Sequence, residues 1–174
     1  FYPKSINKEC TTNIINRLLK HSDGNVYAFC NRSVFKCSMN QTVETVFPDI
    51  AIPSPTYSVA QAPDKDIYIG TESNGLYIYS ENWKLKKHVP IDGIIATILP
   101  DNNGDIWLGL DETGICLFNK NKQTFTWLHK DNTNLNNNSI RTFVSYGDSS
   151  ILVGTFRGLN ILNKKELTIT PANI

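Results

Sequence analysis

The stretch Ile-Leu-Val-Gly-Thr-Phe-Arg-Gly-Leu-Asn-Ile-Leu, residues 151–162, decides the fold of this chain. Apolar β-forming residues lie on both sides of a turn that runs from Gly154 to Gly158. Two such segments around a short glycine-containing turn are typical of a β-hairpin. The same pattern recurs at residues 66–79 and 105–118, and in a degraded form at 24–35. The sequence therefore predicts one hairpin in four copies.

The spacing of these hairpins indicates the architecture. Their first residues, Val26, Ile67, Ile106 and Ile151, are separated by 41, 39 and 45 residues. Repeats of this length that contain several strands are typical of propeller blades. A helical repeat would instead show apolar residues with a period of about 3.6, and no such pattern is present. We therefore expect an all-β protein.

Each repeat carries two further strand-like segments around its hairpin. An apolar segment precedes it at residues 15–18, 95–98 and 140–143, with a weaker copy at 56–59. A more polar segment follows it at 43–47, 83–87, 125–128 and 167–170. Polar turn residues such as those at 22–24 and 101–105 separate the segments. The sequence predicts four four-stranded antiparallel propeller blades at 13–47, 56–87, 94–128 and 139–170.

The pattern favours four consecutive blades of a larger propeller over a closed ring of four. The first repeat is divergent, and residues 1–5 resemble the tail of a preceding outer strand. The chain begins at Phe1 rather than Met and shows no signal peptide, so we expect it to be a piece of a longer protein. An incomplete propeller exposes apolar blade faces at its two ends. We expect another copy or another chain to cover them.

Composition excludes several classes of function. At 174 residues with 40% hydrophobic and 19% charged residues, the chain suits one globular domain rather than a disordered segment. The net charge of +1 argues against nucleic-acid binding. No apolar run approaches the length that spans a bilayer, so we expect no direct membrane insertion.

Four cysteines, Cys10, Cys30, Cys37 and Cys116, leave the redox state open. If residues 31–32 form the first hairpin turn, Cys30 faces Ser33 and Cys37 faces Val26, so a Cys30–Cys37 bridge needs a different register. No Cys-x-x-Cys pair is present, so no zinc site is predicted. Buried free thiols are the favoured interpretation.

The third repeat carries a motif of apolar residues, an aspartate and glycines. Its residues are Ile95, Ile98, Asp101, Gly104, Ile106, Trp107, Leu108, Gly109 and Gly114. This pattern resembles the repeat of two-component-regulator propellers, and the fourth copy adds the ending typical of that repeat at residues 154–160. Residues 136–140 resemble the entry into such a blade. The resemblance covers essentially the whole chain, but the first repeat has Phe29 where glycine is expected.

This resemblance implies a role. Such repeats build the periplasmic sensor regions of hybrid histidine kinase/response regulators that are abundant in gut Bacteroides. Those receptors are anchored in the inner membrane and usually carry two propellers and a small β-sandwich domain. They sense oligosaccharides released from glycans. The resemblance thus implies an oligosaccharide ligand, further blades and a sandwich domain in the parent chain, and a homodimer.

The hairpin turns are the candidate ligand-binding segments. In a propeller they lie on the same face as the blade-to-blade crossovers, which is the usual ligand face. Carboxylates, amides, an arginine and an aromatic ring are the groups that hold sugar hydroxyls and stack on sugar rings. The candidates are Arg157, Phe156, Asp111, Glu112, Glu72, Asn74 and Asn138.

Catalytic residues, a metal site and a cofactor are not predicted. His21 lies in an inter-strand turn, and His88 and His129 end outer strands, so surface histidines are favoured over catalysis. Residues 101–105 resemble a calcium loop but fit a hairpin turn better. Equivalent positions predict that Tyr27, Tyr68 and Trp107 pack between blades. By contrast, Trp83 and Trp127 are expected to be half-exposed on outer strands.

Three functions remain open. The favoured one is a non-enzymatic sensor module that binds a glycan or transmits its binding. A propeller glycosidase or polysaccharide lyase would instead place carboxylates, histidines or tyrosines together at the channel mouth. The third is a scaffold that sets the geometry of a receptor dimer while the ligand sits on another domain.

Overall fold

A computed structural model describes residues 14–30, 33–38, 43–45, 52 and 54–172. Every regular element in these ranges is a β-strand, and the ranges contain no helix that is long and apolar enough to cross a membrane. The predicted strand tail at residues 1–5 and Cys10 lie outside the described residues.

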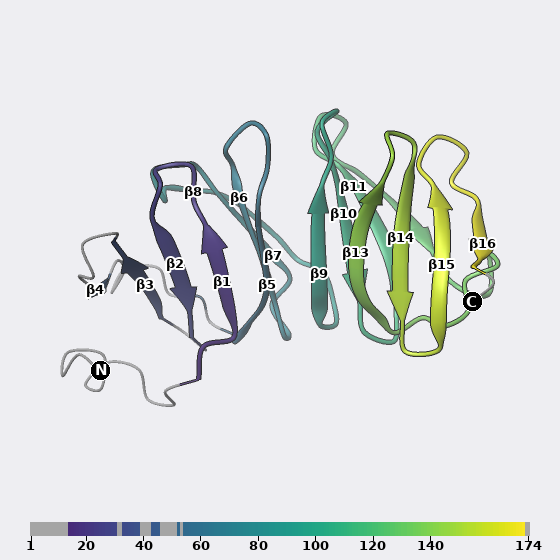
Figure 1. The fold of residues 1–174 in the computed structure, drawn as a ribbon, viewed down its shortest axis with the longest axis horizontal. Helices are drawn as coiled ribbons and strands as arrows, with labels where there is room; N and C mark the ends of the chain where they lie inside the picture. Colours follow the sequence, from purple (N-terminus) through teal and green to yellow (C-terminus); the bar gives the residue numbers. More distant parts are fainter. Residues whose placement is uncertain (1–13, 31–32, 39–42, 46–51, 53, 173–174) are drawn as a thin grey trace. The chain divides into compact units, whose positions relative to one another are not determined.

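The strands form four four-stranded antiparallel sheets, in which neighbours in the sequence are neighbours in the sheet (Figure 1). This arrangement confirms the prediction of four propeller-type blades. The first sheet contains β1 (Arg17–Lys20), β2 (Val26–Phe29), β3 (Val34–Cys37) and β4 (Val43–Thr45). The second contains β5 (Thr56–Gln61), β6 (Ile67–Thr71), β7 (Leu76–Tyr79) and β8 (Leu85–Val89). The third contains β9 (Ile95–Pro100), β10 (Asp105–Leu110), β11 (Gly114–Asn119) and β12 (Thr124–Leu128). The fourth contains β13 (Ile140–Tyr146), β14 (Ser150–Thr155), β15 (Gly158–Asn163) and β16 (Ile169–Pro171).

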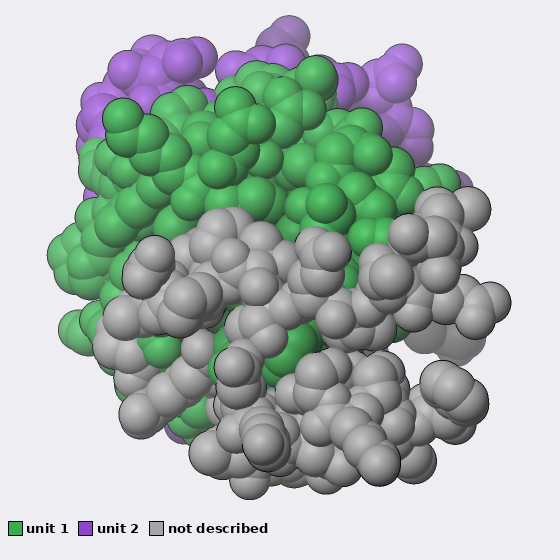
Figure 2. All heavy atoms as spheres, turned by 90° about the vertical axis from the view of Figure 1, so that its left-hand side faces the viewer, with its two compact units in different colours: residues 1–92 green, residues 93–174 purple. Residues whose placement is uncertain are grey.

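The chain divides into two compact units, residues 1–92 and 93–174, which Figure 2 colours separately. The first unit contains the first two sheets and the second unit the last two. Each unit has an apolar core to which both of its sheets contribute. In the first unit Tyr27 and Phe29 belong to the same cluster as Ile67 and Tyr79. In the second unit Trp107 belongs to the same cluster as residues of β13–β16.

A glycine in the second strand lets the first strand approach closely. A Cβ atom on Gly109 would lie 2.5 Å from Ile140 Cγ2 and 2.6 Å from Thr97 Cγ2. A Cβ atom on Gly154 would likewise lie 2.8 Å from Thr142 Cγ2. Real Cβ atoms do not come this close, so packing within the unit requires glycine at these repeat positions.

The equivalent aromatic residues Tyr27, Tyr68 and Trp107 are buried, as the repeat predicted. The two outer tryptophans differ from one another. Trp127 is 37% exposed, as expected, whereas Trp83 is only 8% exposed. Trp83 has a positive φ of 60°, and its ring centroid lies 4.7 Å from that of Tyr27. The turn conformation thus brings a residue predicted to be half-exposed into the core.

The expectation that His21 is a surface residue was wrong. His21 is 4% exposed, and its ring stacks on Trp83 with centroids 5.7 Å apart. Its Nδ1 atom lies 3.0 Å from Asp23 Oδ1. Burial alone would raise the pKa of the Asp23 carboxyl, but hydrogen bonds from Asn25, Tyr27 and His21 lower it well below its usual value.

The cysteine register agrees with the prediction. The amide of Cys30 donates to Ser33 O at 2.9 Å, and Cys37 pairs with Val26. Cys37 and Cys116 are free thiols, and Cys30 and Cys116 are buried. Burial raises the pKa of the Cys116 thiol to about 12.

Candidate functional site

Three of the hairpin turns are fastened in the same way. The amides of Glu72, Asp111 and Phe156 donate hydrogen bonds of 3.0 Å to the carbonyl groups of Pro55, Ile94 and Ser139, respectively. Each acceptor stands immediately before the first strand of its sheet. The turn and the entry into the sheet are therefore held side by side at one end of each sheet, which is the end that the repeat predicted for ligand contacts.

A β-bulge next to each of these hydrogen bonds leaves one residue of the first strand without a partner in the strand pairing. Thr56 and Ser58 pair with consecutive residues of β6, so Tyr57 has no partner in the register. Ala96 in β9 and Arg141 in β13 are bypassed in the same way. Bulges re-aim side chains and are frequent beside functional sites. The bulge thus creates one side-chain position per sheet that is not constrained by strand pairing.

In the second unit the bulged Arg141 joins two of the predicted candidates. Its Nη1 atom lies 3.3 Å from Asp111 Oδ2, and its Cζ atom lies 5.1 Å from the centre of the Phe156 ring. The Arg141 side chain is 46% exposed, and Phe156 is 70% exposed. A carboxylate, a guanidinium and an aromatic ring therefore meet at the surface, on segments fixed by main-chain hydrogen bonds.

The other candidates of this unit surround that group. The Glu112 amide donates to Ser139 Oγ at 3.2 Å, and the Arg157 amide donates to Thr155 Oγ1 at 3.1 Å. The side chains of both Glu112 and Arg157 are exposed. Asn138 has a structural role. Its Oδ1 accepts a hydrogen bond of 2.8 Å from the Lys130 amide, and its main-chain O accepts one of 2.8 Å from the Gly114 amide.

Glu72 and Asn74 lie in the first unit. Glu72 lines a pocket of about 380 Å³ together with the bulged Tyr57 and with Arg17. The carbonyl of Asn74 instead lies 2.7 Å from Nε2 of His88, on the outer strand β8. The structure therefore places Glu72 beside the bulged residue of its own sheet, whereas Asp111 lies beside Arg141, the bulged residue of the next sheet. Asn74 is instead tied to the outer strand β8.

Sequence reasoning missed Arg141 and Tyr57. The apolar spacing located both strands, at 140–143 and 56–59, but spacing does not show where a bulge inserts an extra residue. The available signal was a large polar or aromatic side chain directly after the first residue of the strand, in two repeats out of four.

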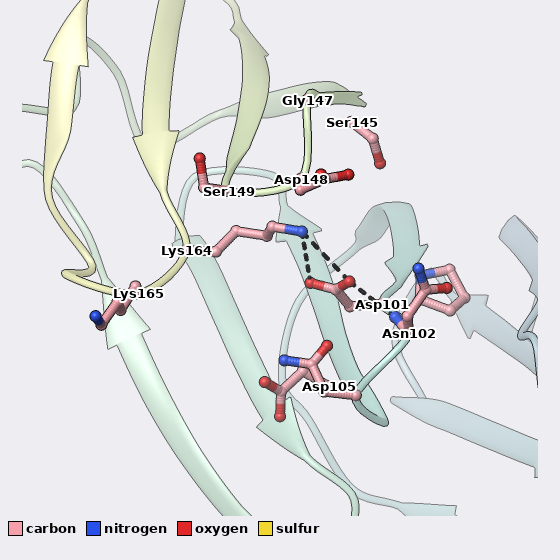
Figure 3. Close-up of a pocket in the computed structure, with 11 residues that line it drawn as sticks. Asp101, Asn102, Asp105, Ser145, Gly147, Asp148, Ser149, Lys164 and Lys165 are labelled. Carbon is pink, nitrogen blue, oxygen red and sulfur yellow. Dashed lines mark hydrogen bonds and ion pairs between the residues drawn. The ribbon is translucent and has the colours of Figure 1, made fainter.

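A second hollow of about 630 Å³ lies at the opposite end of the strands of the second unit (Figure 3). Lys164 reaches across it to Asp101, with Nζ 3.0 Å from Oδ2, and both side chains are mostly buried. Asn119 Nδ2 donates to Asp105 at 2.6 Å, and burial raises the pKa of the Asp105 carboxyl. The ion pair between Lys164 and Asp101 therefore connects the two sides of the hollow.

Residues 101–105 form the hairpin turn that was preferred over a calcium loop. The amide of Asp101 donates to Asp105 O at 2.7 Å, and Gly104 has a φ of +84°. In the ranges that the structure covers, no group of three or more His, Cys, Asp and Glu residues is placed to hold a metal ion.

No family model and no curated protein matches the chain. Solved structures do match. The extracellular domain of the hybrid two-component system BT4673 from B. thetaiotaomicron aligns with a TM-score of 0.79 and 18% identity over 95% of this chain and 22% of that chain. The corresponding domain of BT3049 from B. thetaiotaomicron has a TM-score of 0.72 and 16% identity over 94% of this chain and 25% of that chain.

An enzyme is also among the matches. Virginiamycin B lyase from Staphylococcus aureus aligns with a TM-score of 0.69 and 15% identity over 92% of this chain and 55% of that chain. The chain spans only about a fifth to a quarter of the length of the two-component neighbours. At these identities the likeness shows the fold, and it agrees with four blades that form part of a larger propeller.

Proposed function

We propose that this chain is part of the extracytoplasmic sensor region of a hybrid two-component receptor and that it binds an oligosaccharide without catalysis. The fold likeness to extracellular domains of such systems supports the sensor role. In this proposal the four sheets are consecutive blades of one propeller. The parent chain supplies further blades, a β-sandwich domain and a histidine kinase. It is periplasmic at this region and anchored in the inner membrane.

The observation that carries the ligand proposal is the position of the bulged Arg141 between Asp111 and Phe156. A planar guanidinium donates up to five hydrogen bonds, and a carboxylate accepts several, so the pair can satisfy adjacent sugar hydroxyls. The exposed ring of Phe156 offers an apolar face on which a pyranose can stack. Asp111 also holds the guanidinium in place before the ligand arrives, which reduces the ordering cost of binding.

Signalling then requires that the ligand favour one arrangement of the receptor. A ligand shifts such an equilibrium only by its difference in affinity for the two arrangements. The hairpin turns of the second unit are suited to transmit such a difference, because the main-chain hydrogen bonds of Asp111 and Phe156 connect the turns to the first strands of two sheets. A ligand that contacts both turns would therefore act on both sheets of the second unit.

The test is calorimetric titration of the intact extracytoplasmic region of the parent protein with a panel of oligosaccharides. We expect binding by at least one member of the panel, no release of cleaved product, and weakened binding in an Arg141→Ala variant. Lys87→Ala, which removes an exposed cation from the outer strand β8, is the matched control and should bind normally. Turnover of the glycan would favour the lyase or glycosidase alternative. A folded protein that binds nothing would favour the scaffold alternative.

A further inference from the structure

A polar side chain lies in the core of the second unit. Asn160 of β15 is 0% exposed, and it pairs with Val153 of β14. The equivalent positions of the other three sheets are also buried, and they hold Phe35, Tyr77 and Cys116. A buried amide costs free energy unless both its donor and its acceptor are bonded. The fourth sheet therefore needs hydrogen-bond partners at a position where an apolar residue would need none.

Both ends of the Asn160 amide are bonded to the crossover from β12 to β13, residues 129–139. Its Oδ1 accepts a hydrogen bond of 3.4 Å from the Asn136 amide, and its Nδ2 donates one of 3.4 Å to Asn134 O. These two main-chain groups flank Leu135, which is 4% exposed and belongs to the core cluster of the second unit. Asn160 therefore holds the main chain of the crossover on both sides of the side chain that anchors it in the core.

The last residue of the crossover is bonded to the hairpin turns that carry the candidate ligand residues. Ser139 O accepts from the Phe156 amide at 3.0 Å, and Ser139 Oγ accepts from the Glu112 amide at 3.2 Å. The Ser139 amide donates to Asn137 Oδ1 at 2.8 Å, so this end of the crossover is also ordered by one of its own side chains. Turns from both sheets of the second unit are therefore bonded to one short segment, and Asn160 holds that segment at its other end.

We propose that Asn160 is a positioning residue of the candidate ligand site. It keeps the crossover in the conformation that holds the turns of Glu112 and Phe156 in place for an oligosaccharide. This inference rests on the proposed function, because it concerns the same site. Asn160 is fully buried, so it acts through the crossover and does not touch the sugar. If the crossover is held in place for only a fraction of the time, the apparent affinity falls in proportion to that fraction.

Replacing Asn160 with leucine removes both hydrogen bonds at nearly constant shape. The two side chains have the same number and branching of heavy atoms, but leucine has no donor or acceptor. The freed main-chain groups belong to Asn134 and Asn136, which are exposed residues and can bond water instead. The urea midpoint of Asn160→Leu should therefore not fall. Calorimetric titration of the intact extracytoplasmic region, with the panel oligosaccharide that binds most tightly, should show an affinity about threefold to tenfold lower, as expected if the crossover is held for a tenth to a third of the time.

Asn163→Leu is the matched control for this substitution. Asn163 stands at the other end of β15, and its Oδ1 accepts hydrogen bonds of 3.0 Å from the amides of Lys165 and Glu166 in the following turn. The control makes the same chemical change in the same strand and also removes two hydrogen bonds, but it does not touch the crossover. It should leave the affinity unchanged even if it lowers the urea midpoint. Equal losses of affinity in the two variants would overturn the proposal.

Amide hydrogen exchange of the same region tests the positioning without any sugar. In the unsubstituted protein the Asn136 amide should exchange about tenfold more slowly, relative to its unfolded-state rate, than the Asn137 amide. The Asn136 amide is bonded to a buried side chain, whereas the described residues offer the Asn137 amide no acceptor. In Asn160→Leu the Phe156 amide should exchange about threefold to tenfold faster than in the unsubstituted protein. In Asn163→Leu its rate should not change.

The two measurements separate this inference from the proposed function. Weaker binding in Arg141→Ala together with unchanged affinity in Asn160→Leu would overturn the positioning role and keep the sugar site. If no oligosaccharide binds, the proposed function fails, and the exchange rates alone decide whether Asn160 positions the turns. Equal exchange of the Asn136 and Asn137 amides in the unsubstituted protein, or an unchanged Phe156 amide in Asn160→Leu, would overturn the inference.

Discussion

The Cζ atom of Arg141 lies 5.1 Å from the centre of the Phe156 ring, while Nη1 of the same side chain lies 3.3 Å from Asp111 Oδ2. Arg141 comes from a strand, whereas Phe156 and Asp111 come from two different hairpin turns. One bulged residue thus links the two turns of the second unit.

Replacing Arg141 with lysine should separate binding from stability. Lysine keeps the charge but loses the planar array of donors, so oligosaccharide affinity should fall about 10- to 100-fold, as expected for the loss of charge-assisted hydrogen bonds. The free energy of unfolding should change by less than about 1 kcal/mol, because the pair is exposed. Calorimetric titration and urea denaturation measure the two quantities. An unchanged affinity would exclude Arg141 from the ligand site.

Replacing Phe156 with alanine should weaken binding more modestly. Loss of an aromatic stacking contact costs about 0.5–1.5 kcal/mol, which corresponds to roughly a twofold to tenfold loss of affinity. Because the ring is exposed, the thermal midpoint should not change measurably. Phe156→Tyr, which retains the ring, is the control and should bind as the parent does. Equal loss in both variants would mean that stacking is not the contribution of Phe156.

Substitution of Gly109 with alanine should destabilise the second unit strongly. The new methyl group would meet Ile140 Cγ2 at 2.5 Å and Thr97 Cγ2 at 2.6 Å, so side chains of both neighbouring strands must move. Overpacking of this kind costs about 1–3 kcal/mol or more. Gly147→Ala is the control, since nothing lies within 4 Å of its Cβ position and only its φ of +62° opposes the change. Urea denaturation should show the larger loss for Gly109→Ala.

The buried thiol of Cys116 should be unreactive in the folded protein. Burial raises its pKa to about 12, so almost no thiolate, the reactive form, is present at pH 8. Cys37 is only partly buried and should be labelled by iodoacetamide before Cys116. Mass spectrometry of peptides after brief labelling measures both rates. Rapid labelling of Cys116 without denaturant would show that the core around it opens readily.

Asp23 should make the first unit less stable in acid. Its pKa is lowered in the folded state from an ordinary value of 3.8, chiefly by hydrogen bonds that overcome the effect of burial. A lowered folded pKa contributes stability above pH 3.8, and that contribution is lost as the pH falls below it toward the folded pKa. The urea midpoint should thus fall less between pH 5 and pH 2.5 in Asp23→Asn than in the unsubstituted chain. Parallel pH profiles of the two proteins would contradict this assignment.

The repeat pattern predicted the strands well because alternation and glycine turns are local properties of the sequence. The hairpin at Gly154–Gly158 and its copies determine where the second and third strands of each sheet begin and end. The burial of His21 and Trp83 was not predictable in this way. It depends on a left-handed residue in one turn that meets another turn of the same unit, and neither the conformation nor the contact leaves a pattern in the sequence.

The candidate site was predicted in part. The turn residues Asp111 and Phe156 were identified because turns gather at one end of a blade, and the structure brings both to Arg141. Arg141 itself was missed because a bulge changes the direction of a side chain without changing the apolar pattern around it. The placement of Asn74 near His88 was missed for a related reason, since the outer strand and the turn meet only in three dimensions.

The bulge shared by three sheets has an evolutionary consequence. Tyr57, Ala96 and Arg141 occupy the same position, and each is bypassed in the pairing of its strand. A side chain there can change from aromatic to small to cationic while the ladder of hydrogen bonds on both sides is kept. Specificity in this architecture can therefore diverge one blade at a time, through a residue that the folding of the blade does not constrain.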